Sequence, residues 1–284
     1  DEALEIKLLT TISGNVSLEK CTRNLCHLLD KYKIDLPVAM GAEKPLVRNV
    51  KTATYIHSEN GMGGYIPPKT AKHKPIAENA VDAMYRVLSE GDGDIVPLVL
   101  GPHTNIATLI TKYPDIVKKI PRIIFMGGSP FDMPGFTNHI SFNISSDPEA
   151  FDIVLKSGIP LVMIPYDMGR KLSYLPEKFV YKLRDMNEVG GFLYQMYSTY
   201  WEPKFDDKRI AMNDSCAYMY LVHQELFSCR RALVTVDTTD TPGKTFVEFN
   251  RKGNVWITVG LRRRKFLRII ENKVRALGHI KFDV

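Results

Sequence analysis

The sequence predicts an α/β fold with an open, mostly parallel central sheet flanked by helices, formed by residues 1–284 as one domain. Short apolar runs rich in branched residues alternate with helical patterns, which is typical of parallel strands joined by helical crossovers. Polar residues and glycines directly follow these runs. A chain of 284 residues, 44% of them hydrophobic, is long enough to bury one substantial core.

Four apolar runs are the predicted strands, at residues 6–12, 95–100, 123–126 and 159–164. Each ends at residues that favour turns, as expected for strands buried on both faces. An open parallel sheet binds ligands at the carboxyl ends of its strands. We therefore expect a site formed by the residues that follow the runs, which are Ser13-Gly14-Asn15, Gly101 to Asn105, Gly127-Gly128-Ser129 and Asp167-Met168-Gly169.

Several helix starts are also predicted by the sequence. Asp147 is a predicted N-cap, because Pro148 follows it at the first helical position and Glu149 places an acid in the first turn. Ser17 is expected to cap a leucine-rich helix, and Thr104-Asn105 a second one. The stretch between residues 165 and 214 is expected to be mostly helical.

The charge pattern gives no sign of a nucleic-acid polymer as partner. The formal net charge is +6, and part of it lies in Arg262-Arg263-Arg264-Lys265, ahead of apolar residues at helical spacing. That pattern favours a solvated helix face over a nucleic-acid site, because no basic groove or aromatic stack accompanies it. No run of about 18 apolar residues is present, so no membrane partner is expected.

The four cysteines have no C-x-x-C spacing and no paired histidines. Reduced thiols in a cytoplasmic protein are the simplest interpretation. Cys216 lies beside Asp214 and can be considered as a nucleophile, but no base stands at a telling spacing, which favours a small buried residue. The glycine pairs at residues 63–64 and 127–128 do not form G-x-G-x-x-G, which argues against a dinucleotide-dependent oxidoreductase.

An ordered set of segments resembles the nucleoside hydrolases, which cleave the N-glycosidic bond of ribonucleosides around a bound calcium ion. The segments occur in that family's order and cover nearly the whole chain. They are residues 10–17 (TTISGNVS), 44–46 (KPL), 57–64 (HSENGMGG), 101–107 (GPHTNIA), 125–128 (FMGG), 142–150 (FNISSDPEA) and 212–220 (MNDSCAYMY).

The resemblance implies a Ca²⁺ cofactor. Asp214 resembles the family's late metal-ligand aspartate, and Thr104 the threonine whose carbonyl oxygen also binds calcium. Calcium takes six to eight oxygen ligands, so these two donors are suitable but insufficient. The alternatives are an N-cap role for Asp214 and a cap or turn role for Thr104.

The resemblance also suggests ribose-binding residues. Asn143 resembles an asparagine that hydrogen-bonds ribose, and Met126 a residue that lines the sugar pocket, while a turn residue and a core residue are the alternatives. Asn15 lies in the first matched segment and is also expected to bind the substrate. Ser141 stands where the family usually has a glutamate that binds the 5′-hydroxyl, and Phe136 also departs from the family pattern.

The base-side residues implied by the resemblance are His57, Asn213, Tyr197 and Trp201. His57 can polarise or protonate a leaving base near neutral pH, or can be a loop residue with a structural partner. Asn213 stands where several relatives have a histidine, and its amide can hydrogen-bond a base but cannot act as an acid. Tyr197 and Trp201 resemble aromatics beside the base, although their spacing also fits core packing.

The family's D-x-D-x-G-x-D-D strand end, which supplies metal ligands and the catalytic base, has no match in this sequence. We expect about 20 to 35 residues ahead of Asp1 to carry it, because the inferred parallel sheet lacks its expected first strand. The function predicted is hydrolysis of small-molecule ribonucleosides by a homodimer or homotetramer. The alternatives are an inactive nucleoside- or sugar-binding relative and a hydrolase of another N-ribosyl substrate.

Overall fold

The computed structural model describes residues 4–131, 140–197 and 209–278, and confirms the α/β fold. A central sheet has six strands in the order β3-β4-β5-β10-β8-β9. The first four of these run parallel, β8 pairs antiparallel with β10, and β9 pairs antiparallel with β8. The strands are β3 (Leu98–Val99), β4 (Ile123–Met126), β5 (Leu161–Ile164), β8 (Phe227–Val236), β9 (Thr245–Phe249) and β10 (Val255–Leu261).

Two further pairs of strands lie outside this sheet. β1 (Leu9–Thr11) and β2 (Val38–Met40) pair in parallel, and β6 (Tyr174–Pro176) pairs antiparallel with β7 (Arg209–Ala211). The predicted strands at residues 6–12, 95–100 and 159–164 are therefore present but shorter than expected. Strand 123–126 has the predicted bounds.

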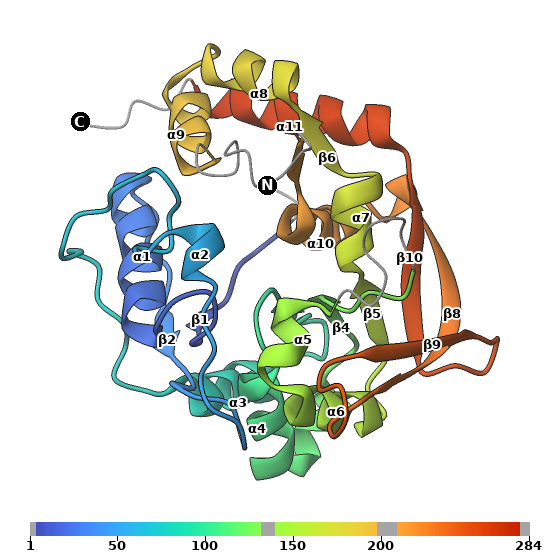
Figure 1. The fold of residues 1–284 in the computed structure, drawn as a ribbon. Coiled ribbons are helices and arrows are strands. Elements are labelled where there is room, and N and C mark those ends of the chain that lie inside the picture. The colour runs from blue at the N-terminus through green and yellow to red at the C-terminus, as the bar shows by residue number, and fades with distance from the viewer. Residues whose placement is uncertain (1–3, 132–139, 198–208, 279–284) are drawn as a thin grey trace.

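Helices cover both faces of the central sheet (Figure 1). α3 (Ala80–Glu90), α4 (Thr104–Lys112) and α6 (Pro148–Lys156) lie on one side, and α10 (Asn213–Val222) and α11 (Arg263–Leu277) on the other. The remaining helices are α1 (Leu18–Lys31), α2 (Thr54–His57), α5 (Phe142–Ser146), α7 (Tyr166–Lys171), α8 (Glu177–Arg184) and α9 (Glu188–Tyr197).

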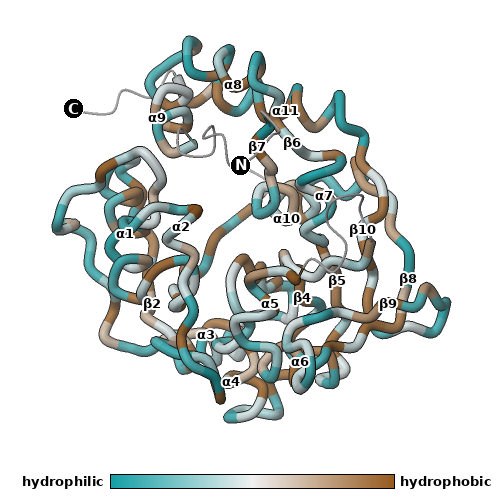
Figure 2. The backbone as a smooth tube through the Cα atoms, in the orientation of Figure 1, coloured by the Kyte–Doolittle hydropathy of each residue, from teal (hydrophilic) through white to brown (hydrophobic). Residues whose placement is uncertain are grey.

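The two faces of the sheet bury two separate hydrophobic clusters. Along β4, Ile123 and Phe125 belong to the cluster with α4 and α6, whereas Ile124 and Met126 belong to the cluster with α10 and α11. This alternation is the two-residue period of a strand covered on both faces. All four residues of β4 and of β5 are buried, which explains their continuous hydrophobic sequence (Figure 2).

Two of the predicted helix caps are confirmed. Asp147 accepts a hydrogen bond from the Ala150 amide at 3.1 Å and caps α6, and Ser17 caps α1. The cap predicted at Thr104-Asn105 is wrong, since His103 is the N-cap of α4 and makes no side-chain capping bond.

Asn105 instead joins two layers of the molecule. Its side-chain oxygen accepts from the Ala42 amide at 2.9 Å, and its side-chain nitrogen donates to the Thr11 carbonyl at 3.1 Å. Thr11 ends β1 and Ala42 follows β2, so this one amide fastens the β1–β2 pair to α4. A glycine stands at residue 41 because a Cβ there would lie 2.3 Å from the Asn105 side chain.

The basic cluster at residues 262–265 begins α11, as predicted, and Phe266 and Val274 bury the apolar stripe of this helix. All four cysteines are free, and burial raises the pKa of Cys216 to about 12, which argues against its action as a nucleophile. No helix within the described ranges is long and apolar enough to span a membrane.

Candidate active site

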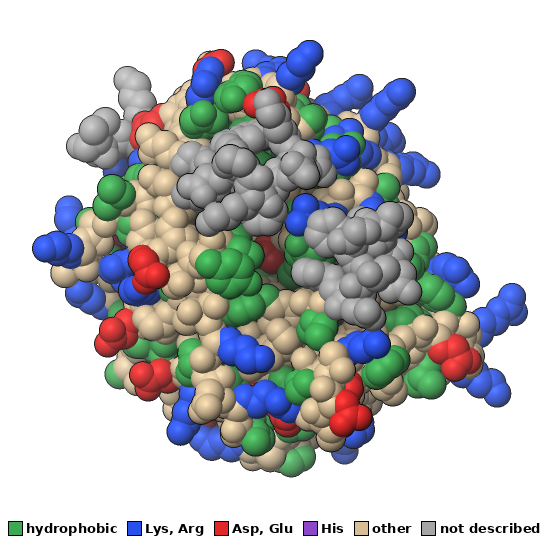
Figure 3. Space-filling model, in the orientation of Figure 1, with side chains coloured by type: hydrophobic (Ala, Val, Ile, Leu, Met, Phe, Trp, Pro, Cys, Tyr) green, Lys and Arg blue, Asp and Glu red, His purple; other side chains and the backbone are tan. Residues whose placement is uncertain are grey.

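β4, β5 and the start of α10 lie around a central opening of the ribbon (Figure 1). The space-filling view shows a hollow here, with an acidic side chain visible at its base (Figure 3). This is the edge at which the sequence predicted a site. The sequence-predicted residues approach it from several elements.

Asn143 and Met126 are brought together at this edge. The Asn143 side-chain nitrogen donates to the Met126 carbonyl at 3.0 Å and lies 3.3 Å from the Met126 sulfur. It also donates to the carbonyl of Leu100, at 3.0 Å. Since Leu100 follows β3 and Met126 ends β4, the Asn143 amide bridges the carboxyl ends of two neighbouring strands.

Asp214 lies in the first turn of α10, one residue past its start, so the N-cap alternative is wrong; Met212 is the cap residue. The side chain is open to solvent, yet the surrounding protein displaces enough water to raise the pKa of Asp214 to about 6. Burial is the sole cause, and no salt bridge to Asp214 forms within the described part of the chain. A carboxylate that is reachable but poorly hydrated is suited to a cation.

Asn213 lies directly before it and is held against α7. A Cβ on Gly169 would lie 1.7 Å from the Asn213 side-chain oxygen, so residue 169 must be glycine for this approach. That oxygen is buried and has no hydrogen-bond partner among the described residues. An unpaired buried amide oxygen is costly, and a donor from a ligand or a water would satisfy it.

Tyr197, the last residue of α9, lies close enough to Asp214 for the carboxylate charge to act on it. Burial first, and then Asp214, raises the pKa of Tyr197 to about 12. Its hydroxyl also approaches the Met212 sulfur at 3.8 Å. Tyr197 is thus part of the wall around the acid, while Trp201 lies outside the described residues.

His57 ends the short helix α2, on the other side of the opening in Figure 1. Its side chain is partly buried, and that burial lowers its pKa, so near neutral pH the ring is mostly uncharged. Ser58, which follows it, has φ of 64°, in the left-handed region that a serine rarely adopts.

The other predicted residues have mainly structural contacts. Asn15 is exposed, and its carbonyl accepts from the Ala53 amide at 2.9 Å, which fastens the start of α2. Ser141 is 2% exposed at the start of α5. Thr104 is 3% exposed, and its carbonyl accepts the Thr108 hydroxyl at 2.8 Å within α4.

Two functional candidates were missed in the sequence. The carbonyl of Leu100 offers an oxygen at the carboxyl edge of β3, but a main-chain atom leaves no side-chain signal. Asp147 was recognised only as a helix cap, although its carboxylate also accepts from Thr104 and Leu46. Within the described ranges no group of three or more His, Cys, Asp or Glu residues could hold a metal ion.

Comparisons with known proteins agree on one class. Residues 1–268 match the model of the inosine-uridine preferring nucleoside hydrolase family. The non-specific ribonucleoside hydrolase RihC of Salmonella paratyphi B is 37% identical over 247 residues, which are 86% of this chain and 79% of that protein.

Solved structures give the same result. A purine-preferring ribonucleoside hydrolase from Gardnerella vaginalis superposes with a TM-score of 0.89 at 26% identity, over 99% of this chain and 93% of that one. The plant nucleoside hydrolase PpNRh1 superposes with a TM-score of 0.86 at 25% identity, over 96% and 91%. The fold is that of the nucleoside hydrolases, and the class of protein is a nucleoside N-ribohydrolase. The chain belongs to the inosine-uridine preferring nucleoside hydrolase family.

Proposed function

We propose that this protein hydrolyses ribonucleosides to a free base and ribose, with Asp214 as a ligand of a calcium ion. The observation that carries the proposal is the Asp214 carboxylate, which lies exposed in the first turn of α10 at the opening and forms no salt bridge with a described residue. A hard, oxygen-seeking cation such as Ca²⁺ fits that group. When bound, the cation would hold the sugar diol and lower the pKa of a water.

The Leu100 carbonyl is a better candidate than the Thr104 carbonyl for the main-chain ligand of calcium. The Thr104 carbonyl already accepts a hydrogen bond from the Thr108 hydroxyl inside α4, and Thr104 is buried. The Leu100 carbonyl lies at the carboxyl edge of β3, on an exposed residue, and accepts from Asn143, which is itself a ribose candidate. Carbonyl and carboxylate oxygens together are the donors that calcium prefers.

Different residues of the chain would then contact the ribose and the base of the substrate. Asn143 and Met126 would hold the ribose, and Asn213, His57 and Tyr197 would surround the base. The Asn213 amide can hydrogen-bond the base but cannot donate a proton to it, so help for the leaving group rests on His57. No residue of this sequence matches the water-activating aspartate that the resemblance implies. Ser141, at 2% exposure, carries no direct contact in this proposal.

Free ribose released from a panel of purine and pyrimidine ribonucleosides, with calcium or with a chelator, tests the function. We expect calcium-dependent release that Asp214→Ala lowers by several orders of magnitude, as when metal activation of water is lost. Asp152→Ala is the control, because that acid pairs with Lys156 on the outer side of α6. Chelated protein at the full rate would contradict the metal role. Binding without release would identify a nucleoside-binding relative.

The expected homodimer or homotetramer and the cytoplasmic location stay predictions. Sedimentation velocity of the purified protein tests the first of these.

A further inference from the structure

Two five-residue stretches next to the site are joined by hydrogen bonds at both of their ends. Residues 100–104 lead from β3 into α4, and residues 143–147 lead from α5 into α6. At one end, the Asn143 side-chain nitrogen donates to the Leu100 carbonyl at 3.0 Å. At the other end, the Thr104 hydroxyl donates to the Asp147 carboxylate at 2.6 Å. The two stretches and two bonds form a closed ring.

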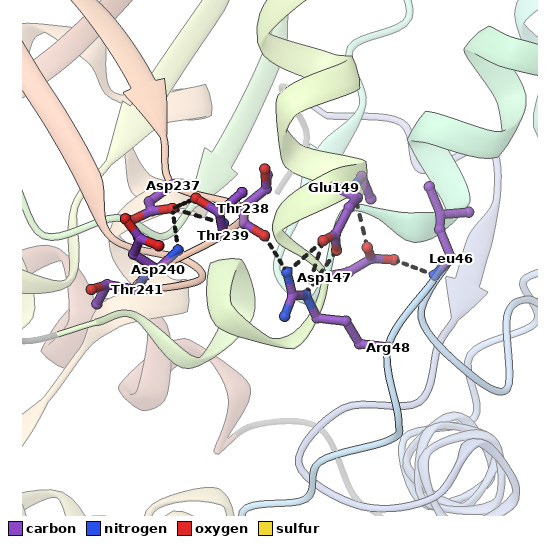
Figure 4. Close-up of polar contacts among 10 residues, drawn as sticks. Leu46, Arg48, Asp147, Glu149, Asp237, Thr238, Thr239, Asp240 and Thr241 are labelled. Atoms are coloured by element: carbon purple, nitrogen blue, oxygen red, sulfur yellow. Dashed lines mark hydrogen bonds and ion pairs between the residues drawn. The ribbon is translucent and has the colours of Figure 1, made fainter.

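The Asp147 end of this ring is rigidly built. Asp147 is 0% exposed, and besides the Thr104 hydroxyl it accepts from the Ala150 amide at 3.1 Å and the Leu46 amide at 2.9 Å. Figure 4 shows Asp147 and Glu149 directed from the start of α6 toward Leu46 and Arg48. A buried carboxylate with three donors has little freedom to move, and losing one donor weakens its site.

The Arg48 end of this contact adds a further restraint. The Arg48 guanidinium donates to both oxygens of Glu149, and to the Thr238 carbonyl at 2.6 Å (Figure 4). The segment that carries Leu46 and Arg48 is therefore hydrogen-bonded to Asp147 and Glu149, at the start of α6.

At the Asn143 end, the ring decides which atom of the amide meets a ligand. An amide nitrogen has two hydrogens, and those of Asn143 are directed at the Leu100 and Met126 carbonyls. The Asn143 oxygen remains, and no described residue donates to it. Asn143 is therefore presented as an acceptor, which takes a proton donor such as a sugar hydroxyl.

We propose that Thr104 is a positioning residue, which through Asp147 and α5 sets the Asn143 oxygen to accept one ribose hydroxyl. This rests on the proposed function, since it assumes that Asn143 faces the sugar. It assigns to Thr104 a role through its hydroxyl, in place of the metal role expected for its carbonyl. The ring is intact only while the Thr104 hydroxyl can donate.

The test compares ribonucleosides with their 2′-, 3′- and 5′-deoxy analogues, by kcat/KM, and by Kd from calorimetry if turnover is absent. In the wild type, removing the hydroxyl that Asn143 accepts should cost about 5- to 100-fold, the scale of an unpaired hydrogen-bonding group. Asn143→Ala should abolish the discrimination for that one hydroxyl. Thr104→Val, which keeps the side-chain shape, should reduce it at least about threefold and leave the deoxy analogue unaffected.

Two variants separate positioning from general damage. Thr104→Ser keeps the hydroxyl and should restore wild-type discrimination. Thr108→Val removes a hydroxyl one turn further along α4, which donates to the Thr104 carbonyl, and should leave discrimination unchanged. The positioning role is overturned if Thr104→Val lowers kcat/KM, or weakens binding, equally for all substrates. It is also overturned if Thr104→Val keeps full discrimination while Asn143→Ala loses it. If Asn143→Ala itself discriminates like the wild type, the proposed ribose contact fails instead.

Discussion

Asp214 is the residue on which the proposed chemistry of the site depends. Its pKa is raised from 3.8 to about 6 because protein surrounds it. The folded state then holds this proton more tightly than the unfolded state does. Without a cation, the contribution of Asp214 to stability is therefore greatest below pH 4 and declines as the pH rises from about 4 to about 6.

Calcium should reverse that decline, because it binds the carboxylate form alone. We expect added Ca²⁺ to raise the melting temperature at pH 7.5 clearly more than at pH 5, measured by scanning fluorimetry. Asp214→Asn should remove the calcium-dependent rise, whereas Asp152→Asn should keep it. A rise of equal size in both variants would place the cation elsewhere.

His57 gives the second prediction at this scale. His57→Ala should slow natural nucleosides by about 10²- to 10⁴-fold, the usual range of general acid catalysis, yet hardly change p-nitrophenyl riboside, whose leaving group departs without a proton. Because burial lowers the pKa of His57 from 6.5, the wild-type advantage should grow as the pH falls toward that pKa. Equal losses on both substrates would mean that His57 supports structure or ribose binding.

At the scale of elements, the Asn105 side chain on α4 hydrogen-bonds to residues that end or follow the strands of the β1–β2 pair. Asn105→Ala leaves the Ala42 amide without its acceptor and removes one donor to the Thr11 carbonyl, which still accepts from the Gly41 amide. We expect a loss of about 1–3 kcal/mol in the free energy of unfolding, the cost of stranded polar groups, measured by urea titration. Thr111→Ala removes a hydroxyl from an exposed residue of the same helix. It should change the free energy of unfolding by no more than about 0.5 kcal/mol. Similar values for both variants would show that Asn105 does not fasten the layers.

At the scale of the whole molecule, the two faces of one sheet carry two cores. Phe151 is 0% exposed in the cluster with α4 and α6, and Phe266 is 0% exposed in the cluster with α11. Each change to alanine should cost about 3–5 kcal/mol, and the two costs should add because the sheet separates them.

Calorimetry of these variants also tests the single domain predicted for residues 1–284. Both cores share the strands β4 and β5, so one cooperative transition that moves as a whole is expected in each variant. Two separated transitions, of which each variant shifts only one, would divide the chain into two domains.

The sequence alone determined the fold class and pointed to the sheet edge at which the proposed site lies. Buried parallel strands are continuously apolar, and turn residues follow them, so residues 123–126 and the cap at Asp147 could be read directly. The family also followed from the order of short segments. These signals come from residues close together in the chain, so the sequence contains them without the fold.

Tertiary structure alone decided how the residues divide their roles. Asn105 was expected as a cap and instead fastens β1–β2, and the Thr104 hydroxyl reaches Asp147, 43 residues further along the chain. The raised pKa of Asp214 follows from the protein packed around it, and the Leu100 carbonyl has no side chain to announce it. Hydrogen bonding and desolvation depend on neighbours that are distant in sequence, and only the folded chain brings them together.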